Sequence, residues 1–281
     1  VSMKSVTSLG VFGNPIAHSL SPRIHALFAQ TRQDSINYQR YLSTPGHFPR
    51  RVAEFFRHGG QGANVTLPFK QQAASLVTKL SDRARLAGAV NTLIPYGNGQ
   101  LLGDNTDGEG LIIDLKNKGL EVSEHSLVVF GAGGSARGII PLLLEQNPRC
   151  LYLVNRTAKK AEILKSQLET LGLVAANRIQ VRSSASEIDE PIDLLINATS
   201  SSLNGQRLTL PPLLSENASG YDLMYADQPT EFMEQLTQAG CKNVSDGFGM
   251  LIEQAASSYQ LWMGGERPDT AFVMAEMRTP S

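Results

Sequence analysis

Short apolar runs alternate with longer segments whose apolar residues recur at helical spacing. In the first part of the chain, residues 9–12, 37–42 and 62–67 predict strands. Between and after them, residues 48–57 and 68–80 predict helices. This alternation is typical of α/β folds with parallel sheets and disfavours an all-α or all-β fold. Two further runs, at residues 89–95 and 100–104, predict a hairpin around Gly97-Asn-Gly99.

A second series of strands is expected in the later part of the chain. They lie at residues 126–130, 179–182, 193–197, 220–223 and 242–244, with another ending at Val154. A final apolar helical region at residues 250–262 follows these strands, and we expect it to return to the first domain. The chain is long enough for two cores. We therefore predict a discontinuous substrate domain of residues 1–107 plus 248–281, and a nucleotide-binding domain of residues 108–247.

The segment around Gly131 has the organisation of a mononucleotide-binding unit. A buried strand is followed by Gly131-Ala-Gly-Gly-Ser-Ala136, a helical stretch and a second strand end at Val154. Glycines at 131 and 133 allow a tight turn and close approach to a pyrophosphate, and Ala136 lets the helix pack on the strand. The pattern predicts a Rossmann domain that binds a dinucleotide.

The residues after the second strand indicate which dinucleotide. NAD sites usually carry an acid here, but no Asp or Glu occurs from residue 146 to residue 161. The same stretch contains Arg149, Arg156, Lys159 and Lys160, of which Lys159 is expected on a solvated helix face. Because a 2′-phosphate favours arginine, the stretch favours NADP.

Polar side chains follow the strand at residues 62–67. Its alternation places Asn64 and Thr66 on one face near the carboxyl end, where clefts of open α/β sheets lie. Lys70 follows at the start of the next helix, and it is either a proton-exchanging group or a surface lysine. Asp107 offers a complementary carboxylate, although an acid at a helix start is also favoured by the helix dipole.

Two serines and two histidines in the early part of the chain have less decisive patterns. Ser19 and Ser21 share a face if their segment is extended, which suits a carboxylate ligand, but Ser21 also suits a helix N-cap before Pro22. His18 and His25 are expected in a loop and on a helix face, without a metal cluster nearby.

Composition narrows the classes of function. The 281 residues carry 25 Lys and Arg against 26 Asp and Glu, which disfavours a nucleic-acid partner. Two cysteines, Cys150 and Cys241, suggest neither a disulfide framework nor a metal site. We find no signal-peptide pattern and no apolar stretch long enough to span a membrane, so a soluble cytoplasmic protein is expected.

Several motifs stand in a fixed order along the chain. Before the glycine loop these are Asn14-Pro-Ile-Ala-His-Ser-Leu-Ser21, Gly62-Ala-Asn-Val-Thr-Leu-Pro-Phe-Lys70, Ala89-Val-Asn-Thr92 and Asp104-Asn-Thr-Asp-Gly108. After it come Asn155-Arg-Thr157, Asn197-Ala-Thr-Ser200, Tyr221-Asp-Leu-Met-Tyr225 and Asp246-Gly-Phe-Gly-Met-Leu-Ile-Glu-Gln254. Over nearly its whole length the chain resembles the shikimate dehydrogenase family.

The resemblance implies an oxidoreductase that reversibly reduces 3-dehydroshikimate to shikimate with NADPH, in the pathway to chorismate and the aromatic amino acids. It implies that Lys70 and Asp107 are the catalytic pair. The implied substrate-binding residues are Ser19, Ser21, Asn64, Thr66, Asn91, Tyr225 and Gln254, with the serines and the tyrosine near the substrate carboxylate. The implied cofactor-binding residues are Gly131, Ala132, Gly133, Gly134, Ser135, Ala136, Asn155, Arg156, Thr157, Lys160, Thr199, Leu223 and Gly247. Leu223 departs from the methionine common in the family but keeps an apolar wall. No metal is implied, and a monomer or homodimer is expected.

Three other functions stay open. A quinate/shikimate dehydrogenase or a paralogue with another substrate would use the same cleft residues. Methylene-tetrahydrofolate dehydrogenase has a related architecture, but the set Ser19, Ser21, Lys70 and Asp107 argues against it. A catalytically silent NADP-binding sensor would keep the glycine loop, and an absence of turnover with shikimate and NADP would favour it.

Overall fold

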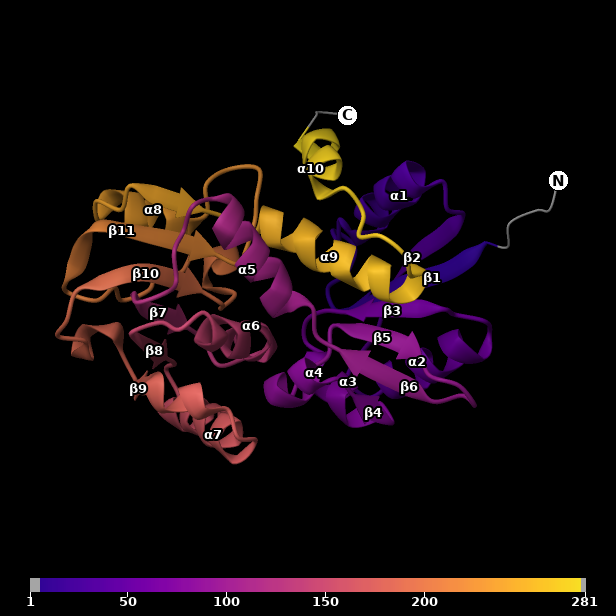
Figure 1. The fold of residues 1–281 in the computed structure, drawn as a ribbon, viewed down its shortest axis with the longest axis horizontal. Coiled ribbons are helices and arrows are strands. Elements are labelled where there is room, and N and C mark those ends of the chain that lie inside the picture. Colours follow the sequence, from indigo (N-terminus) through magenta and orange to yellow (C-terminus); the bar gives the residue numbers. More distant parts are fainter. Residues whose placement is uncertain (1–5, 279–281) are drawn as a thin grey trace. The chain divides into compact units, whose positions relative to one another are not determined.

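The computed structural model describes residues 6–278, and the chain divides into two compact units. The first unit comprises residues 1–110 and 252–281, and the second comprises residues 111–251 (Figure 1). Among residues 6–278, no helix is both long enough and apolar enough to cross a membrane.

The first unit contains a six-stranded sheet in the order β2-β1-β3-β5-β6-β4. Its strands are β1 (Thr7–Gly13), β2 (Ile36–Leu42), β3 (Gly62–Val65), β4 (Lys79–Leu80), β5 (Thr92–Pro95) and β6 (Leu101–Asp104). β1 runs parallel to β2 and β3, whereas β5 runs antiparallel to both β3 and β6. The sheet is therefore mixed, where the alternation of elements predicted a parallel one. The expected hairpin causes this, because Gly97 and Gly99 adopt positive φ and reverse the chain without a helix.

Helices α1 (Ser21–Arg32), α2 (Phe48–Arg57), α3 (Lys70–Leu76), α4 (Asp82–Ala87) and α10 (Thr270–Arg278) belong to the first unit. The helix predicted over residues 68–80 is wrong in its limits. Pro68 lies in a turn, α3 ends at Leu76, and β4 then pairs with β6. The hydroxyl of Ser81 accepts from Ala84 N and so caps a separate helix, α4, which the sequence analysis missed.

Aromatic side chains fill much of the core of the first unit. Phe48 and Phe69 stack with ring centroids 4.6 Å apart, and Phe12 meets Phe48 edge to face at 6.0 Å. Phe69 is only 1% exposed and immediately precedes Lys70. Burial of this ring therefore fixes the start of α3.

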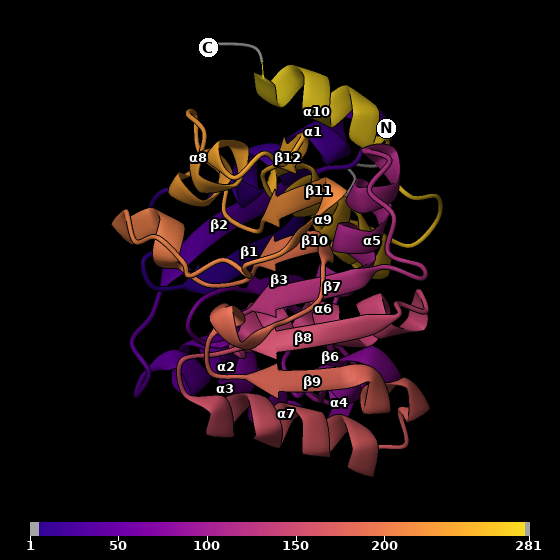
Figure 2. The ribbon, with the colours of Figure 1, turned by 90° about the vertical axis from the view of Figure 1, so that its left-hand side faces the viewer.

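The second unit contains six parallel strands in the order β12-β11-β10-β7-β8-β9 (Figure 2). They are β7 (Ser126–Phe130), β8 (Cys150–Val154), β9 (Ile179–Arg182), β10 (Ile192–Asn197), β11 (Leu214–Asp222) and β12 (Asn243–Ser245). The helical elements of this unit are α6 (Gly134–Glu145), α7 (Ala158–Thr170), α8 (Glu231–Gln238) and the 3₁₀ turns η1 (Val174–Arg178), η2 (Ala185–Glu187) and η3 (Ser201–Asn204). This is the doubly wound order of a Rossmann sheet, which confirms the predicted α/β class.

Two further helices pass from one unit to the other. α5 (Asp107–Asn117) begins in the first unit and ends in the second, and α9 (Phe248–Met263) runs from the second unit back into the first. The late helix expected at residues 250–262 is therefore present, and from Ile252 onward it belongs to the first unit.

Pro141 lies inside α6 without ending it, although a proline in a helix interior usually bends the helix or breaks its hydrogen bonding. The helix continues from Gly134 to Glu145. Its neighbours Ile140 and Leu143 are fully buried. Packing of this face outweighs the single backbone hydrogen bond that proline cannot donate.

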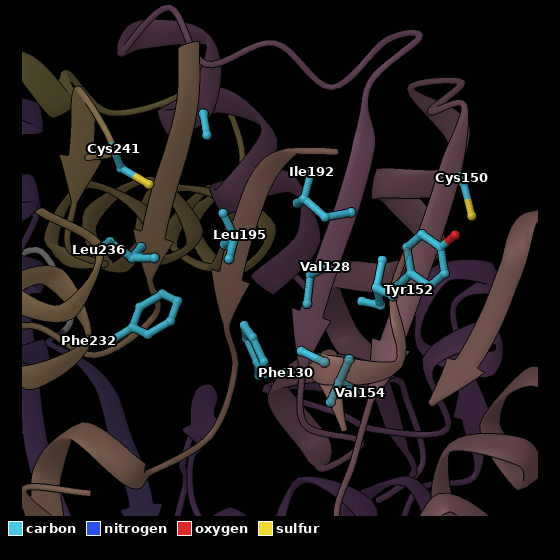
Figure 3. Packing of buried hydrophobic residues seen from close by; sticks show 13 residues of the cluster. Val128, Phe130, Cys150, Tyr152, Val154, Ile192, Leu195, Phe232, Leu236 and Cys241 are labelled. Carbon is cyan, nitrogen blue, oxygen red and sulfur yellow. The ribbon is translucent and has the colours of Figure 1, made fainter. Parts of the chain in front are cut away.

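One hydrophobic cluster of the second unit covers the middle strands (Figure 3). Phe130 at the end of β7 meets Phe232 of α8 edge to face, with centroids 5.8 Å apart. Cys150, at the start of β8, and Cys241, between α8 and β12, both belong to this cluster and are free thiols. The cluster includes Phe130 and Val154, the last residues of β7 and β8, and so fixes the ends of these strands.

Candidate active site and cofactor site

Lys70 and Asp107 form an ion pair within the first unit. The Lys70 Nζ donates to Asp107 Oδ2 over 2.6 Å, and the two side chains are 11% and 4% exposed. Lys70 opens α3 and Asp107 opens α5. Within residues 6–278 the ammonium group makes this one hydrogen bond, so its other N–H groups can reach a ligand.

Asn91 fixes the orientation of the Asp107 carboxylate. Its Nδ2 donates to Asp107 Oδ1 over 2.9 Å, and its Oδ1 accepts from Thr106 N over 2.9 Å. Its own main-chain N–H donates to the carbonyl of Asp104 over 3.0 Å. Lys70 and Asn91 thus each hold one oxygen of Asp107, so the carboxylate has one orientation in the site.

Asn64, at the carboxyl end of β3, is held from both ends of its amide. Tyr38 of β2 donates its hydroxyl to Asn64 Oδ1 over 2.7 Å, while Asn64 Nδ2 donates to the carbonyl of Asn91 over 3.1 Å. Burial raises the pKa of Tyr38, so its hydroxyl stays a donor. Asn64 is therefore a fixed polar group. Thr66 lies two residues after Asn64, just beyond the end of β3, and is half-buried.

The two serines lie at the start of α1, but Ser21 is not the cap of that helix. The N-cap residue is Leu20, with no side-chain cap, so the prediction that Ser21 caps this helix is wrong. Ser21 instead hydrogen-bonds Tyr38. Ser19 Oγ accepts from Ser21 N over 3.3 Å, and its carbonyl accepts from Arg40 over 2.7 Å. Tyr38 thus connects the serine segment with Asn64.

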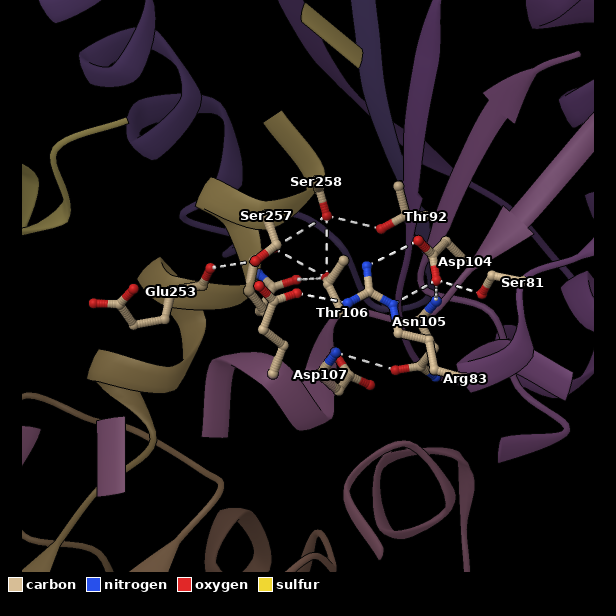
Figure 4. A network of polar contacts seen from close by, with 12 residues as sticks. Ser81, Arg83, Thr92, Asp104, Asn105, Thr106, Asp107, Glu253, Ser257 and Ser258 are labelled. Carbon is tan, nitrogen blue, oxygen red and sulfur yellow. Dashed lines mark hydrogen bonds and ion pairs between the residues drawn. The ribbon is translucent and has the colours of Figure 1, made fainter. Parts of the chain in front are cut away.

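Helix α9 contributes polar groups from the far end of the chain to the same cluster. Gln254 Oε1 accepts from Asn91 Nδ2 over 3.1 Å. The fully buried hydroxyl of Ser258 bonds to Thr92 Oγ1 over 2.7 Å and accepts from Asn64 Nδ2 over 3.1 Å (Figure 4). The polar cluster around Asn64 and Asn91 is therefore complete only when α9 packs on β3 and β5.

Arg83 of α4 clamps the segment that carries Asp107 (Figure 4). Its guanidinium donates to both oxygens of Asp104 over 2.7 and 2.8 Å, and to Glu109 over 2.6 Å. Burial pushes the pKa of Asp104 upward, but hydrogen bonding and charge from Arg83 outweigh it and hold this pKa below its ordinary value. Arg83 thus holds Asp104 and Glu109, which lie before and after Asp107 in the sequence.

His25 lies on a face of α1, as expected, and is fully buried. Its ring stacks on Tyr38 with centroids 4.4 Å apart. Burial lowers the pKa of His25 to about 3, so the ring is neutral at physiological pH. It supports Tyr38 by packing. Within residues 6–278, no group of His, Cys, Asp and Glu is placed to hold a metal ion.

The glycine loop joins β7 to α6 in the second unit. Gly131 has φ +104, and a Cβ there would lie 3.0 Å from Thr199 Cγ2. Gly133 is the N-cap of α6 and provides no side-chain cap, and a Cβ on it would meet nothing within 4 Å. The backbone N–H groups at this helix start can therefore receive a phosphate. Ala136 is fully buried, as its packing role predicts.

Asn155, Arg156, Thr157 and Lys160 follow the end of β8. Asn155 is half-buried and donates to the carbonyl of Thr157 over 2.8 Å, while the other three are exposed. Arg149 differs from the prediction, because it lies at the opposite end of β8 and pairs with Asp193 at 3.2 Å. The basic side chains expected at the cofactor site that follow the carboxyl end of β8 are thus Arg156 and Lys160.

Leu223 and Gly247 are neighbours in the second unit. A Cβ on Gly247 would lie 2.2 Å from the carbonyl oxygen of Leu223, so only glycine fits there. Leu223 N donates to the carbonyl of Asn197 over 2.9 Å. Tyr225 is half-buried, packs against Phe248 at 6.3 Å and belongs to this unit. The other implied substrate-binding and catalytic residues belong to the first unit. They form the cluster of hydroxyls and amides described above or lie next to it: Ser19, Ser21, Asn64, Thr66, Lys70, Asn91, Asp107 and Gln254.

Some residues of these sites were missed by sequence reasoning. Tyr38 lies on a strand whose pattern gave no reason to single out its hydroxyl, and Ser258 lies in an apolar helix. Arg83 lies between the helix predicted at residues 68–80 and the run at residues 89–95, in a segment for which no element was predicted. Their contacts in the structure show what these side chains do: Tyr38 and Ser258 hydrogen-bond to Asn64, and Arg83 pairs with Asp104.

Three family models match successive parts of the chain. The shikimate dehydrogenase substrate binding domain matches residues 11–93, shikimate/quinate 5-dehydrogenase matches residues 114–205, and the shikimate 5′-dehydrogenase C-terminal domain matches residues 247–278. A shikimate dehydrogenase (NADP(+)) of Idiomarina loihiensis is 97% identical over 279 residues, which cover 99% of this chain and all of that protein. The chain belongs to the shikimate dehydrogenase family.

Other members of the family and solved structures agree. A shikimate dehydrogenase (NADP(+)) of Colwellia psychrerythraea is 45% identical over 95% of both chains. The shikimate 5-dehydrogenase of Thermus thermophilus, solved with NADP(H) and shikimate, has a TM-score of 0.82 and 29% identity, covering 97% of this chain and 99% of that one. A 5-ketofructose reductase of Gluconobacter matches with a TM-score of 0.80 and 27% identity, covering 97% of each chain. The fold by itself therefore does not define the substrate.

Proposed function

We propose that this protein is an NADP-dependent shikimate dehydrogenase that reversibly reduces 3-dehydroshikimate to shikimate, with Lys70 and Asp107 as its acid–base pair. The observation that carries the proposal is the 2.6 Å contact between Lys70 Nζ and Asp107 Oδ2 in a cluster of fixed amides and hydroxyls. Curated relatives of this chain carry the same activity in their names.

The residues of the second unit fit NADP. The uncapped start of α6 after Gly133 suits a pyrophosphate, and the exposed Arg156 suits a 2′-phosphate. We assign Gly131 to Ala136, Asn155, Arg156, Thr157, Lys160, Thr199, Leu223 and Gly247 to this site. When bound, NADPH supplies the hydride that reduces the ring ketone.

Lys70 supplies the proton of the reaction. As hydride adds to the carbonyl carbon, the carbonyl π bond breaks toward oxygen, and the Lys70 ammonium donates a proton to that oxygen. The ketone is thereby reduced to an alcohol, the cofactor is oxidised, and Lys70 is left as a neutral amine. In the reverse direction the amine takes the hydroxyl proton. Asp107 keeps the Lys70 amine in place and can accept a hydrogen bond from a neighbouring substrate hydroxyl.

The remaining substrate residues hold the hydroxylated ring acid. We assign the substrate carboxylate to the hydroxyls of Ser19, Ser21 and Tyr225, and its ring hydroxyls to the amides of Asn64, Asn91 and Gln254. Thr66 contributes a further hydroxyl. Quinate is the second candidate substrate, because one matching family model covers shikimate and quinate dehydrogenases together.

The function places the protein on the route to chorismate and the aromatic amino acids, which consumes NADPH. We propose a cytoplasmic location and a monomer or homodimer, without nucleic-acid or membrane partners.

Four initial rates test the assignment of substrate and cofactor. Shikimate and quinate are each oxidised with NADP and with NAD, and the appearance of the reduced cofactor is followed by absorbance. We expect the highest kcat/KM for shikimate with NADP. A preference for quinate or NAD would replace that assignment, and no turnover with any of the four pairs would favour a silent NADP-binding protein.

A further inference from the structure

A buried carboxylate at the end of β11 has no part in the chemistry described above. Asp222 is fully buried, and none of the ion pairs found in residues 6–278 includes it. Burial raises the pKa of Asp222 although hydrogen bonds from Ser202 and Thr230 act against the shift. An acid that is costly to bury and lacks a cation needs another explanation for its presence.

Four donors converge on this carboxylate, two on each oxygen. Asp222 Oδ1 accepts from Asn197 Nδ2 and from Met224 N, each over 3.1 Å. Asp222 Oδ2 accepts from Ser202 Oγ over 2.5 Å and from Thr230 Oγ1 over 2.6 Å. One side chain therefore connects the end of β10, the segment after β11, the turn η3 and the start of α8.

The two groups that donate to Asp222 Oδ1, Asn197 and Met224, also hydrogen-bond to residues that we assign to the cofactor site. Asn197 turns its own Oδ1 to Thr199, accepting from Thr199 N over 3.0 Å and from Thr199 Oγ1 over 2.7 Å. Its main-chain carbonyl accepts from Leu223 N over 2.9 Å. Met224, the other donor to Oδ1, accepts through its carbonyl from Gly247 N over 3.1 Å. Thr199, Leu223 and Gly247 are thus each one hydrogen-bonded step from the Asp222 network.

The strand order indicates which half of the cofactor this network serves. The glycine loop follows β7, which lies between β8 and β10. Arg156 follows β8, so the adenosine 2′-phosphate belongs on the β8 side of the loop. The other half of the dinucleotide, which carries the nicotinamide, then belongs on the side of β10 and β11, where Asp222 lies.

We propose that Asp222 is a positioning residue for the nicotinamide half of the NADP site, which it holds in shape through Asn197 and Met224. The inference rests on the proposed function, because it takes NADP as the ligand. Asp222 does not touch the reacting atoms. It provides acceptors that keep the ends of β10 and β11 and the Gly247 segment in register.

The test compares a whole dinucleotide with its adenosine half. Dissociation constants for NADPH and for 2′,5′-ADP are measured by calorimetry on the full chain, for wild type and for Asp222→Ala. We expect the alanine variant to bind NADPH at least about tenfold more weakly and 2′,5′-ADP within about twofold of wild type. Loss of the two acceptor oxygens, and with them four hydrogen bonds, should disorder the β10 and β11 ends, while the β8 end keeps its contacts.

Three further variants separate this role from general damage. Asp222→Asn should restore most of the NADPH affinity, because its Oδ1 can serve Asn197 and Met224 while its Nδ2 faces two hydroxyls that can accept. Asp189→Ala is a matched change at an exposed aspartate and should alter neither constant. Asp222→Ser replaces the alanine variant if alanine prevents folding, and the same selective loss is expected.

Equal loss of NADPH and 2′,5′-ADP in the Asp222 variants would overturn the proposal and leave only a structural role. Unchanged NADPH binding would overturn it too. Arg156→Gln tests the underlying site separately, since it should weaken 2′,5′-ADP. If it does not, the assignment of the cofactor site itself fails, whatever the Asp222 variants show.

Discussion

Replacing Lys70 with methionine removes the ammonium group and keeps most of the apolar stem. General acid catalysis contributes about 10²- to 10⁴-fold, so we expect kcat to fall by at least about 100-fold, which is about 2.7 kcal/mol of transition-state stabilisation. The KM for shikimate should change only a few-fold, because the serines and amides that hold the ring acid remain.

The same substitution should also cost stability. It leaves Asp107, whose side chain is 4% exposed, without its cation. Removing one partner of a buried pair costs about 3–5 kcal/mol, and the lower end applies here because Asn91 Nδ2 still donates to Asp107. Typical domain stabilities exceed this loss, so the variant should fold and can be assayed.

Urea unfolding and steady-state kinetics with shikimate and NADP measure the two effects. Lys79→Met is the matched control, since Lys79 is an exposed lysine of the same unit, and it should keep wild-type kcat. Lys70→Arg should recover stability but not kcat, because a guanidinium keeps the charge and does not release a proton. A Lys70→Met protein with wild-type turnover would refute the proton-donor role.

Three other substitutions test separate parts of the structure. Arg156→Gln should raise the KM for NADP at least about tenfold and leave the KM for NAD nearly unchanged, since it removes a charge opposite a 2′-phosphate; equal effects in steady-state assays would contradict this. His25→Phe should make stability less sensitive to acid. In the wild type, His25 takes up a proton below pH 6.5 when the chain is unfolded, but only near pH 3 when it is folded. The free energy of unfolding therefore decreases as the pH falls through this range. Urea unfolding at pH 6.5 and 4.5 should show the wild type losing about 2 kcal/mol more than the variant. Arg83→Met should cost about 2 kcal/mol of stability, because Asp104 loses a partly exposed cation, and should lower kcat several-fold by loosening the Asp107 segment; a stability loss with unchanged kcat would leave Arg83 only structural.

The sequence predicted the second unit well because its signals are local. Buried parallel strands appear as short apolar runs, and the glycine loop must follow a strand and open a helix, so β7, α6 and β8 were found together. The strand at residues 179–182 has the same limits as β9. The resemblance to a known family and the expectation of NADP are both confirmed by the relatives.

The first unit was harder to predict because its decisive contacts are distant in sequence. The pairing of β4 with β6 depends on the hairpin that follows, so residues 68–80 alone resemble one helix. Tyr38 contacts Asn64 across 26 positions, and Ser258 reaches it across 194. Such hydroxyls carry no periodic signal, and their neighbours are decided by topology. The roles of the substrate and cofactor residues remain predictions.

Because α9 returns to the first unit, the last part of that unit is synthesised after the whole of the second unit. Trp262 of this helix donates to the carbonyl of Leu93, and its ring lies where a Cβ on Gly62 would be. A ribosome therefore completes every residue of the second unit before it supplies the helix that closes the first. The nascent chain can form its nucleotide-binding unit before α9 completes the surroundings of Lys70 and Asp107. A translation product that stops between Leu251 and Gln254 would therefore contain all of the second unit but lack Gln254 and Ser258 of the polar cluster.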